Sequence, residues 1–410
     1  MKSKTLAVQS ILEVTENWAK WRQLSGHSQS SKAQIRSQDR KFRRTLMKRN
    51  IARATLEIFS VAALWAAMAV PAEAQHFPGI GTVMTYNVNE GTDFLQVVGA
   101  QTLQQFLLGV GQVITQVQGT NPPERMGAVA RKILDVQPEL LSLQEVDQWY
   151  TGTFDPVAGT CSNITLKYDM LQELLSSLAA QGGHYEVAVQ VTQNSFPPTP
   201  GLIPPADYTC VAVNDYNVIL ARTDLPSWIF RWSNPQSGQF VNKLVLPTPI
   251  GPVPYPRAWA SVDAQFFGHS LLYVNTHLES FDANIRELQG GELRAGPANS
   301  TLPVIIAMDS NAQAFPLPQD PTYLDFISAR YNDVWSELFP KIAGLTCCQD
   351  EADNNSISQL YQRIDLVLTH GRVTPWEAAR IGEDRRSRLP DGLWPSDHAA
   401  VVAGVVVGSD

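Results

Sequence analysis

Apolar and polar residues follow two different spacings along residues 81–407, and these spacings predict strands and helices in turn. Short apolar segments such as 139–146 are typical of buried strands, whereas Leu171, Leu174 and Leu178 recur at helical spacing. The predicted helices cover residues 93–118, 123–136, 167–180, 282–294 and 322–330. The predicted strands cover residues 81–88, 139–146, 185–191, 216–222, 241–246, 257–266, 270–277, 304–308, 363–369, 373–381 and 399–407. Such an alternation is typical of an α/β fold.

Turn-forming residues separate several of these elements. Gly268 joins two predicted strands in the manner of a hairpin. Residues 194–209 are rich in proline, which removes hydrogen-bond donors from a strand, so we expect a loop there. No internal repeat or low-complexity linker interrupts residues 76–410. We therefore predict a single domain over residues 75–410.

An apolar segment near the N-terminus has the three parts of an export signal. A positive stretch at residues 47–53 precedes an apolar run at residues 58–70, and the small-residue site Ala72-Glu73-Ala74 follows. We expect cleavage after Ala74 and a secreted or periplasmic protein. A buried core helix is the alternative, but it would not explain why the charge lies on one side of the run.

The residues before this signal are unusual, because residues 1–46 are polar and far longer than an ordinary signal-peptide start. We interpret them as a non-native or disordered extension and predict Met47 as the true start. A cytoplasmic extension that begins at Met1 and continues into an uncleaved anchor is the alternative.

Charge is distributed unevenly along the 410 residues, of which 44% are hydrophobic and 17% charged, enough apolar content for a large core. Residues 1–74 hold 13 of the 31 Lys and Arg but 5 of the 39 Asp and Glu, which leaves residues 75–410 with 18 basic and 34 acidic residues, a net charge of −16. Such an acidic surface disfavours tight, nonspecific binding of nucleic acid. It does not disfavour catalysis on a phosphate through a bound cation.

Four cysteines in an exported chain permit three complete disulfide pairings. Cys161 and Cys210 flank the proline-rich segment, and a bridge between them is favoured while the other pairings stay open. The adjacent Cys347 and Cys348 can bond to each other only through a strained ring, so we expect them to be free, bridged elsewhere or buried. Zinc binding is disfavoured, because no His or Cys lies at zinc-finger spacing from them.

Polar side chains interrupt the ends of many predicted strands. Taken singly, Asn87 is more often a turn former, and Glu145 is more often a solvated strand end. Strands otherwise carry apolar side chains into the core, so repeated carboxylates and imidazoles at their ends suggest a shared rim. The residues in question are Asn87, Glu145, Asp215, His277, Asp309, Asn311, Asp365, Asp397 and His398.

Six segments resemble, in this order, the signatures of the endonuclease/exonuclease/phosphatase superfamily, whose fold is like that of deoxyribonuclease I. They are Thr85-Tyr86-Asn87, Leu143-Gln144-Glu145, Asn275-Thr276-His277-Leu278, Met308-Asp309-Ser310-Asn311-Ala312, Arg363-Ile364-Asp365 and Ser396-Asp397-His398. The family usually has Gly-Asp-Phe-Asn where this chain has Met308-Asp309-Ser310-Asn311. The resemblance implies a secreted bacterial-type member with a four-layer α/β sandwich, in which two packed mixed sheets are flanked by helices.

The resemblance also implies a role for each residue of the rim. Glu145 and Asn87, with Asp397, would hold Mg²⁺ or Mn²⁺, since carboxylate and amide oxygens suit these ions. His398 would be the general base held by Asp365, because a neutral imidazole can accept a proton. The other implied roles are water activation by Asp309, a phosphoryl contact by Asn311, a phosphate or leaving-group contact by His277, a phosphate contact or structural ion pair for Arg257, and histidine orientation by Asp215.

Together these features predict an exported, metal-dependent phosphodiesterase that uses water as the nucleophile. A nucleic acid is the slightly favoured substrate, and Arg380, Arg385, Arg386 and Arg388 would supply local positive charge. A phospholipid or sphingomyelin phosphodiesterase, or a phosphatase, is the alternative, with residues 196–208 or 228–232 engaging the membrane. A non-catalytic binding or toxin-like module on the same fold is a further alternative. We expect a monomer without a stable protein partner.

Overall fold

Two mixed β-sheets form the centre of the chain over the residues that the computed structural model describes, 79–205, 207–350 and 352–408. The predicted signal at 47–74 and the extension at 1–46 lie outside these residues. Within the described ranges, none of the helices is both long and apolar enough to cross a membrane. The described strands and helices belong to one unit of contacts.

The first sheet, sheet A, has the order β15-β16-β1-β2-β6-β3-β4, and β5 pairs with β6. Its centre is mixed, because β1 runs parallel to β2 and antiparallel to β16. Its strands are β1 (Gly79–Asn87), β2 (Leu140–Gln144), β3 (Gln148–Asp155), β4 (Thr160–Asp169), β5 (Tyr185–Ile203), β6 (Asp207–Arg222), β15 (Val373–Ile381) and β16 (Ala400–Val407).

The second sheet, sheet B, has the order β13-β14-β12-β11-β10-β7. Here β11 and β12 run parallel, whereas the other pairs are antiparallel. Its strands are β7 (Phe230–Gln239), β10 (Ala258–Phe266), β11 (His269–His277), β12 (Val304–Asp309), β13 (Asn332–Asp333) and β14 (Asp365–His370), and a separate hairpin consists of β8 (Leu244–Thr248) and β9 (Gly251–Tyr255).

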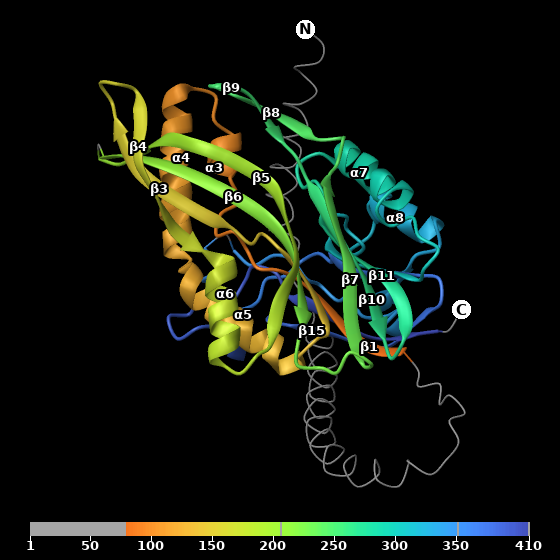
Figure 1. Cartoon of the computed structure of the whole chain (residues 1–410). Coiled ribbons are helices and arrows are strands. Elements are labelled where there is room, and N and C mark those ends of the chain that lie inside the picture. Colours follow the sequence, from red (N-terminus) through yellow and green to blue (C-terminus); the bar gives the residue numbers. More distant parts are fainter. Residues whose placement is uncertain (1–78, 206, 351, 409–410) are drawn as a thin grey trace, which may run out of the picture. The chain divides into compact units, whose positions relative to one another are not determined.

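Three apolar clusters hold four layers together. Val83 and Ile305 belong to a core that joins the facing sides of the two sheets. Ile306 and Phe326 belong to a core between sheet B and the helices α7 and α8, while Val113 belongs to one between α4 and sheet A. The two groups of helices accordingly lie on opposite sides of the sheets (Figure 1). The helices are α3 (Leu95–Val98), α4 (Leu103–Gly119), α5 (Pro122–Val136), α6 (Met170–Ala180), α7 (Ala283–Ala295), α8 (Pro321–Ser328) and α9 (Val334–Leu338). This arrangement confirms the predicted two-sheet α/β sandwich.

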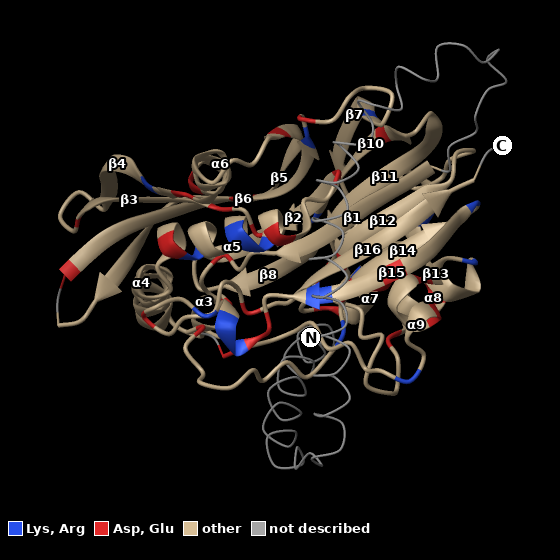
Figure 2. Cartoon of the chain, turned by 90° about the horizontal axis from the view of Figure 1, so that it is seen from below, with Lys and Arg blue, Asp and Glu red and all other residues tan. Residues whose placement is uncertain are grey.

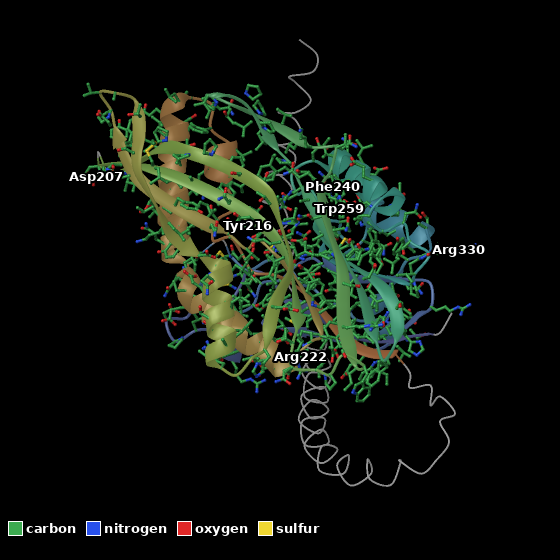
Figure 3. All side chains as sticks on the ribbon, in the orientation of Figure 1. Asp207, Tyr216, Arg222, Phe240, Trp259 and Arg330 are labelled. Atoms are coloured by element: carbon green, nitrogen blue, oxygen red, sulfur yellow. A yellow bond between two sulfur atoms is a disulfide. The ribbon has the colours of Figure 1, made fainter. Side chains whose placement is uncertain are left out.

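The loop predicted at residues 194–209 is wrong, because these residues form the paired ends of β5 and β6. In the described chain β5 is an edge strand that pairs with β6, and an edge tolerates prolines that a central strand would not. The register also shifts between Phe196 and Thr199, which places two prolines in a bulge. The paired strands β5 and β6 therefore form a long arm, along which β6 runs from Asp207 to Arg222 (Figure 3).

In two further regions the structure differs from the prediction. The helix predicted at 93–118 is divided into α3 and α4, because Thr102 and Gln105 form a capping box that starts a new helix. The β3–β4 hairpin and β7 were not predicted at all, since their mixed polar sequences lack a clear apolar period.

The favoured bridge between Cys161 and Cys210 is present, with the two Cα atoms 5.9 Å apart. Cys161 lies on β4 and Cys210 on β6, so the bond ties these two strands together across β3. The described chain also joins Cys347 to Cys348, although this direct bond was the pairing that we disfavoured. Cys347 is buried and Cys348 is half-buried.

A buried polar contact fixes the two sheets against each other near their ends. Asn275 of β11 donates from Nδ2 to the backbone oxygens of Leu143 and Val218 at 3.0 and 2.8 Å, and its Oδ1 accepts from Gln144 at 2.7 Å. Because unpaired polar groups are costly in a core, this set of bonds specifies one alignment of the sheets. That alignment determines which strand ends meet.

Candidate active site

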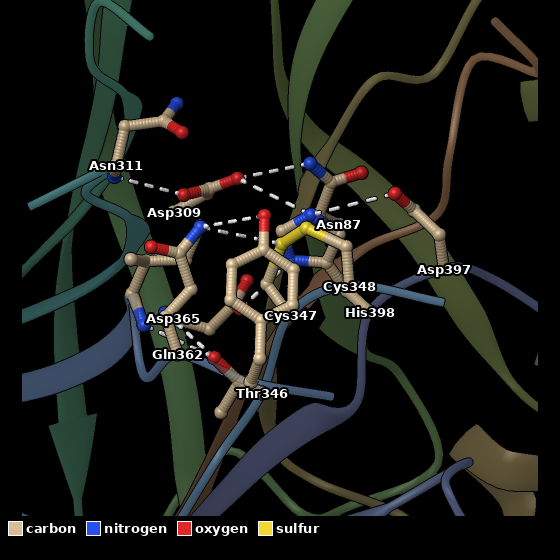
Figure 4. Close-up of a disulfide and its surroundings, with 12 residues drawn as sticks. Asn87, Asp309, Asn311, Thr346, Cys347, Cys348, Gln362, Asp365, Asp397 and His398 are labelled. Carbon is tan, nitrogen blue, oxygen red and sulfur yellow. Dashed lines mark hydrogen bonds and ion pairs between the residues drawn. A yellow bond between two sulfur atoms is a disulfide. The ribbon is translucent and has the colours of Figure 1, made fainter. Parts of the chain in front are cut away.

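The predicted rim residues come from strand ends that meet at one edge of the sandwich. In sheet A, the parallel strands β1 and β2 end at the same edge, which places Asn87 beside Glu145, the residue after β2. In sheet B, the parallel strands β11 and β12 end side by side at His277 and Asp309. The antiparallel β14 begins at Asp365, directly opposite Asp309. The fold thus brings residues that are up to 311 positions apart, Asn87 and His398, into one cluster (Figure 4).

The amide of Asn87 links a carboxylate of sheet A to one of sheet B. Its Nδ2 donates to Oε1 of Glu145 at 2.7 Å and to Oδ2 of Asp309 at 2.9 Å. Its Oδ1 accepts from the backbone N–H of Asn89 at 2.9 Å. Asn87, predicted as a metal ligand, therefore stands in this structure as a donor between two carboxylates, with its oxygen turned toward the backbone.

His398 lies in the loop before β16 and is held by a carboxylate on each side of its ring. Its Nδ1 lies 2.8 Å from Oδ2 of Asp365, and its Nε2 lies 3.9 Å from both Asp309 and Asp397. The hydroxyl of Ser396 fixes the loop, since it accepts from the His398 N–H at 3.0 Å and donates to the backbone oxygen of Asn87 at 2.7 Å. The predicted pair of Asp365 with His398 is thus present in the structure.

The charges around His398 favour its protonated form. Burial by itself would lower the pKa of His398, but Asp365 and Asp397 outweigh that effect and hold the pKa well above its usual value. The ring therefore resembles an imidazolium with carboxylates at both nitrogens. The sequence instead predicted that His398 is a neutral base. A cation bound nearby would counteract the rise in the pKa of His398, because it would neutralise the same carboxylates.

Burial also changes the two carboxylates that Asn87 joins. Burial and the neighbouring Asp397 raise the pKa of Glu145 to about 7. Burial and the neighbouring Asp365 raise the pKa of Asp309 to about 6. Both groups are therefore carboxylates that lack enough positive charge around them.

His277 has the opposite character from His398. Burial, together with the positive charge of Arg257, lowers the pKa of His277 well below its usual value, so the ring is neutral. Its Nε2 lies 2.9 Å from Nδ2 of Asn311 and 3.5 Å from Asp309. Asn311 also donates to the backbone oxygen of Leu278 at 3.0 Å, which ties the β12 loop to the end of β11.

Asp215 reaches this cluster through another side chain. Its Oδ2 accepts from Nε2 of Gln193 at 2.7 Å, and that nitrogen lies 3.4 Å from Nδ1 of His277. Asp215 is accordingly a positioning residue that acts on His277 through Gln193. The prediction had Asp215 orient a histidine directly. Gln193 was missed, because nothing in a polar stretch of an edge strand distinguishes it in the sequence.

The contacts of Arg257 favour a structural ion pair over a phosphate contact. Its Nη2 donates to the hydroxyl of Ser280 at 3.0 Å, its Nε lies 3.9 Å from Glu279, and its guanidinium lies over the ring of Tyr255. The side chain is 2% exposed, so it balances buried carboxylates beside the site. A direct contact with substrate would require it to leave these partners.

Cys347 and Cys348 lie at the cluster although they are 50 residues or more from His398 in sequence. Their sulfur atoms and a ring nitrogen of His398 all lie within 4.8 Å of one another (Figure 4). The cysteine pair is therefore a wall of the site beside His398. Spacing rules that consider only neighbouring residues could not have detected it.

The donors in this cluster suit a hard divalent cation. A carboxylate oxygen of Glu145, one of Asp309 and a ring nitrogen of His277 lie within 4.8 Å of one another. Among these residues Glu145 is half-buried, and the nearby Asn311 and Asp397 are half-buried too, so solvent reaches the cluster on this side. Carboxylate oxygens whose pKa is raised by burial and by each other fit a cation such as Mg²⁺ or Mn²⁺.

The structure weakens the expectation that residues 196–208 or 228–232 engage a membrane. Residues 228–232 lead into β7, whose Phe230 pairs with Phe266 at the end of sheet B opposite His277. In the other segment, the ring of Phe196 packs against those of Phe94 and Tyr255. The first segment therefore lies away from the site, and Phe196 serves ordinary packing.

The predicted group of arginines is partly committed to other contacts. Arg386 pairs with Asp384 at 2.8 Å, and Arg388 donates to the backbone oxygens of Asn354 and Gly392. Arg380 donates to a backbone oxygen as well. In Figure 2, basic and acidic positions are interspersed along the ribbon instead of gathering by sign. The positive charge expected for a nucleic acid is therefore weaker than the sequence suggested.

No family model and no curated protein matches this chain. Among solved structures, the chain is similar to an endonuclease/exonuclease/phosphatase family protein from Bacteroides thetaiotaomicron, with 17% identity, a TM-score of 0.47 and coverage of 81% of this chain and 96% of that one. It is similar to truncated TDP2 from Caenorhabditis elegans, with 18% identity, a TM-score of 0.45 and coverage of 80% and 98%. It is similar to a mannosyl-6-phosphatase from Bacteroides thetaiotaomicron, with 17% identity, a TM-score of 0.46 and coverage of 79% and 99%.

Proposed function

We propose that this chain is a phosphoester hydrolase of the endonuclease/exonuclease/phosphatase superfamily and, more narrowly, an exported, divalent-metal-dependent phosphodiesterase. The observation that carries the proposal is the convergence of six separated motifs on one cluster. Asn87 bonds to carboxylates from both sheets, and Asp365 bonds to His398, all within a largely buried site. A chance set of turn formers and solvated strand ends would not meet in this way.

The cluster provides the groups that attack on a phosphodiester requires. Asp365 fixes the His398 ring, so that its Nε2 faces the space beside Asp309 and Asp397. A charged His398 donates from Nε2 to a phosphoryl or leaving oxygen, where negative charge develops. Asp309 orients the attacking water and accepts its proton, and the neutral His277 contacts the phosphoryl group together with Asn311.

A divalent cation fits the same place. Glu145 would hold it together with Asp397, whose charge acts on Glu145, and with the carboxylate of Asp309 within reach. Asn87 keeps Glu145 in position from the other side. When bound, the ion neutralises phosphoryl oxygens and makes water easier to deprotonate. The completeness of this set of residues argues against a non-catalytic binding module.

The substrate class is a phosphodiester, with a nucleic acid slightly favoured over a phospholipid headgroup. The position of residues 228–232 at the far end of sheet B removes one reason to expect a membrane contact. The arginines before the Ser396 loop still supply some positive charge, although Arg386 and Arg388 have partners. Export rests on the sequence signal, whose residues lie outside those described.

Hydrolysis of bis(p-nitrophenyl) phosphate by the purified chain, with Mg²⁺ and with EDTA, tests the proposed reaction. We expect turnover in Mg²⁺, loss in EDTA and recovery when Mg²⁺ or Mn²⁺ is returned. DNA, RNA and sphingomyelin vesicles then compare the substrate classes under the same conditions. A folded, metal-supplied protein that hydrolyses neither these diesters nor a phosphomonoester would contradict the proposal.

A further inference from the structure

A second group of acids lies beside the candidate active site, and Asp215 is the member whose side chain is linked to that site, through Gln193. Glu90 follows the end of β1 by three residues, Asp147 immediately precedes β3, and Asp215 lies within β6. Carboxylate oxygens of all three lie within 4.8 Å of one another. The three residues are 7%, 0% and 3% exposed, so this is a buried cluster and not a solvated acidic surface.

Asp147 is the member of this cluster without a partner. Among the described residues, no donor reaches either of its carboxylate oxygens, and Oδ1 of Asp215 lacks a donor as well. A buried carboxylate without a partner is strongly destabilising unless it is neutralised or paired. The carboxylate oxygens without a donor indicate that a positively charged ligand binds between these acids.

Arg257 cannot supply all of the missing charge. It acts on both Glu90 and Asp215, but its Nε also lies 3.9 Å from Glu279. One guanidinium thus serves several buried carboxylates. Burial raises the pKa of Asp147 and Glu90 well above their usual values, and a proton shared between Asp147 and Asp215 is the competing way to relieve the repulsion.

The backbone holds the three acids in place before any ligand arrives. The parallel pairing of β1 with β2 brings the segments that carry Glu90 and Asp147 together, and the pairing of Gln148 with Asn214 brings Asp215 beside them. The indole Nε1 of Trp149 donates to the backbone oxygen of Glu90 at 3.1 Å. Three hard oxygen donors on separate, fixed segments of the backbone suit a divalent cation.

We propose that Glu90, Asp147 and Asp215 form a second divalent-cation site, separate from the catalytic one, with Ca²⁺ or Mg²⁺ as the ligand. The cation ties together the segments that follow β1 and β2 and the middle of β6. It also supports the active site, because the backbone N–H of Glu90 donates to Oε2 of Glu145 at 2.9 Å. This proposal concerns cation binding, so it can be tested independently of hydrolytic activity.

Sensitised terbium luminescence tests the site directly, because the buried Trp149 contacts Glu90 and can transfer energy to a lanthanide bound there. The purified chain is titrated with Tb³⁺ under tryptophan excitation, and Ca²⁺ is added to compete. We expect saturable emission in the wild type, apparent affinity lowered at least about tenfold in Asp147→Asn, and emission retained in Glu145→Gln. Emission lost in Glu145→Gln but retained in Asp147→Asn would overturn the proposal.

Ca²⁺ binding by equilibrium dialysis provides a second measurement that does not depend on energy transfer. We expect the wild type to bind one equivalent more than Asp147→Asn, and Asp135→Asn, on the exposed end of α5, to match the wild type. Equal binding by wild type and Asp147→Asn would show that a shared proton, and not a cation, neutralises the cluster.

Thermal unfolding of the variants in EDTA and in Ca²⁺ separates an effect of Asp147→Asn on stability from its effect on cation binding. Because the substitution removes a buried charge, we expect it to melt above the wild type in EDTA and to gain less from Ca²⁺. Glu90→Gln should behave in the same way. If Ca²⁺ stabilised both variants as much as the wild type, the proposed ligands would be wrong.

Discussion

Replacing Asp365 by asparagine tests the pairing with His398 while it preserves the size of the side chain. The Nδ1···Oδ2 distance is 2.8 Å, and the two side chains are 6% and 0% exposed, so the hydrogen bond is buried and charge-assisted. A bond of this kind contributes about 1.5–3 kcal/mol. If it is needed to hold the ring for reaction, its loss lowers kcat about 10- to 150-fold, with KM changed less than about twofold.

The assay is steady-state hydrolysis of bis(p-nitrophenyl) phosphate in Mg²⁺ by Asp365→Asn, His398→Ala and the double variant. Because Asp365 acts through His398, the double variant should be no slower than His398→Ala alone. Asp135→Asn is the matched control, since that side chain is 59% exposed and pairs with Lys132 on the surface. An Asp365→Asn rate within about twofold of wild type, or fully multiplicative losses in the double variant, would refute the reasoning.

Three further outcomes follow from contacts in the same structure. Asn87→Ala removes two hydrogen bonds to carboxylates, one buried and one partly buried, and should lower kcat at least about tenfold in the same assay. An unchanged rate would contradict the bridging role. In EDTA, the free energy of unfolding should fall as pH rises from about 4 to 7, because folded Glu145 and Asp309 retain protons that the unfolded chain releases. Denaturant unfolding curves at several pH values measure this free energy, and a rise over the same range would contradict the prediction. Replacing Cys161 and Cys210 by serine opens a link across 49 positions and should lower the free energy of urea unfolding by about 4 kcal/mol with kcat unchanged, whereas equal stability would exclude a structural role for the bridge.

The sequence predicted the central strands well, because their apolar runs are buried on both faces. β1, β12 and β16 are of this kind, and the strand ends at Asn87 and Asp309 followed from them. The arm of β5 was missed for the opposite reason. An edge strand tolerates prolines, so its sequence lacks the regular period of a half-buried strand.

Contacts between distant residues could not be predicted in the same way. Glu90 and Asp147 are 57 positions apart and meet because β1 and β2 run parallel. Cys347 meets His398 because the loop before β14 passes beside the loop before β16. Protonation states also depend on assembly, since the charge of His398 reflects carboxylates that come from different strands. The resemblance to a family predicted which residues would lie together, but the fold determines their charges.

The most direct test of the proposed function compares wild type, Glu145→Gln and His398→Ala in the hydrolysis of bis(p-nitrophenyl) phosphate with Mg²⁺. Circular dichroism and thermal unfolding show whether each variant is folded before its rate is measured. The account predicts turnover by the wild type that EDTA abolishes, and losses of at least about 100-fold in both variants. Rates that match the wild type in both folded variants, or turnover that persists in EDTA, would contradict it.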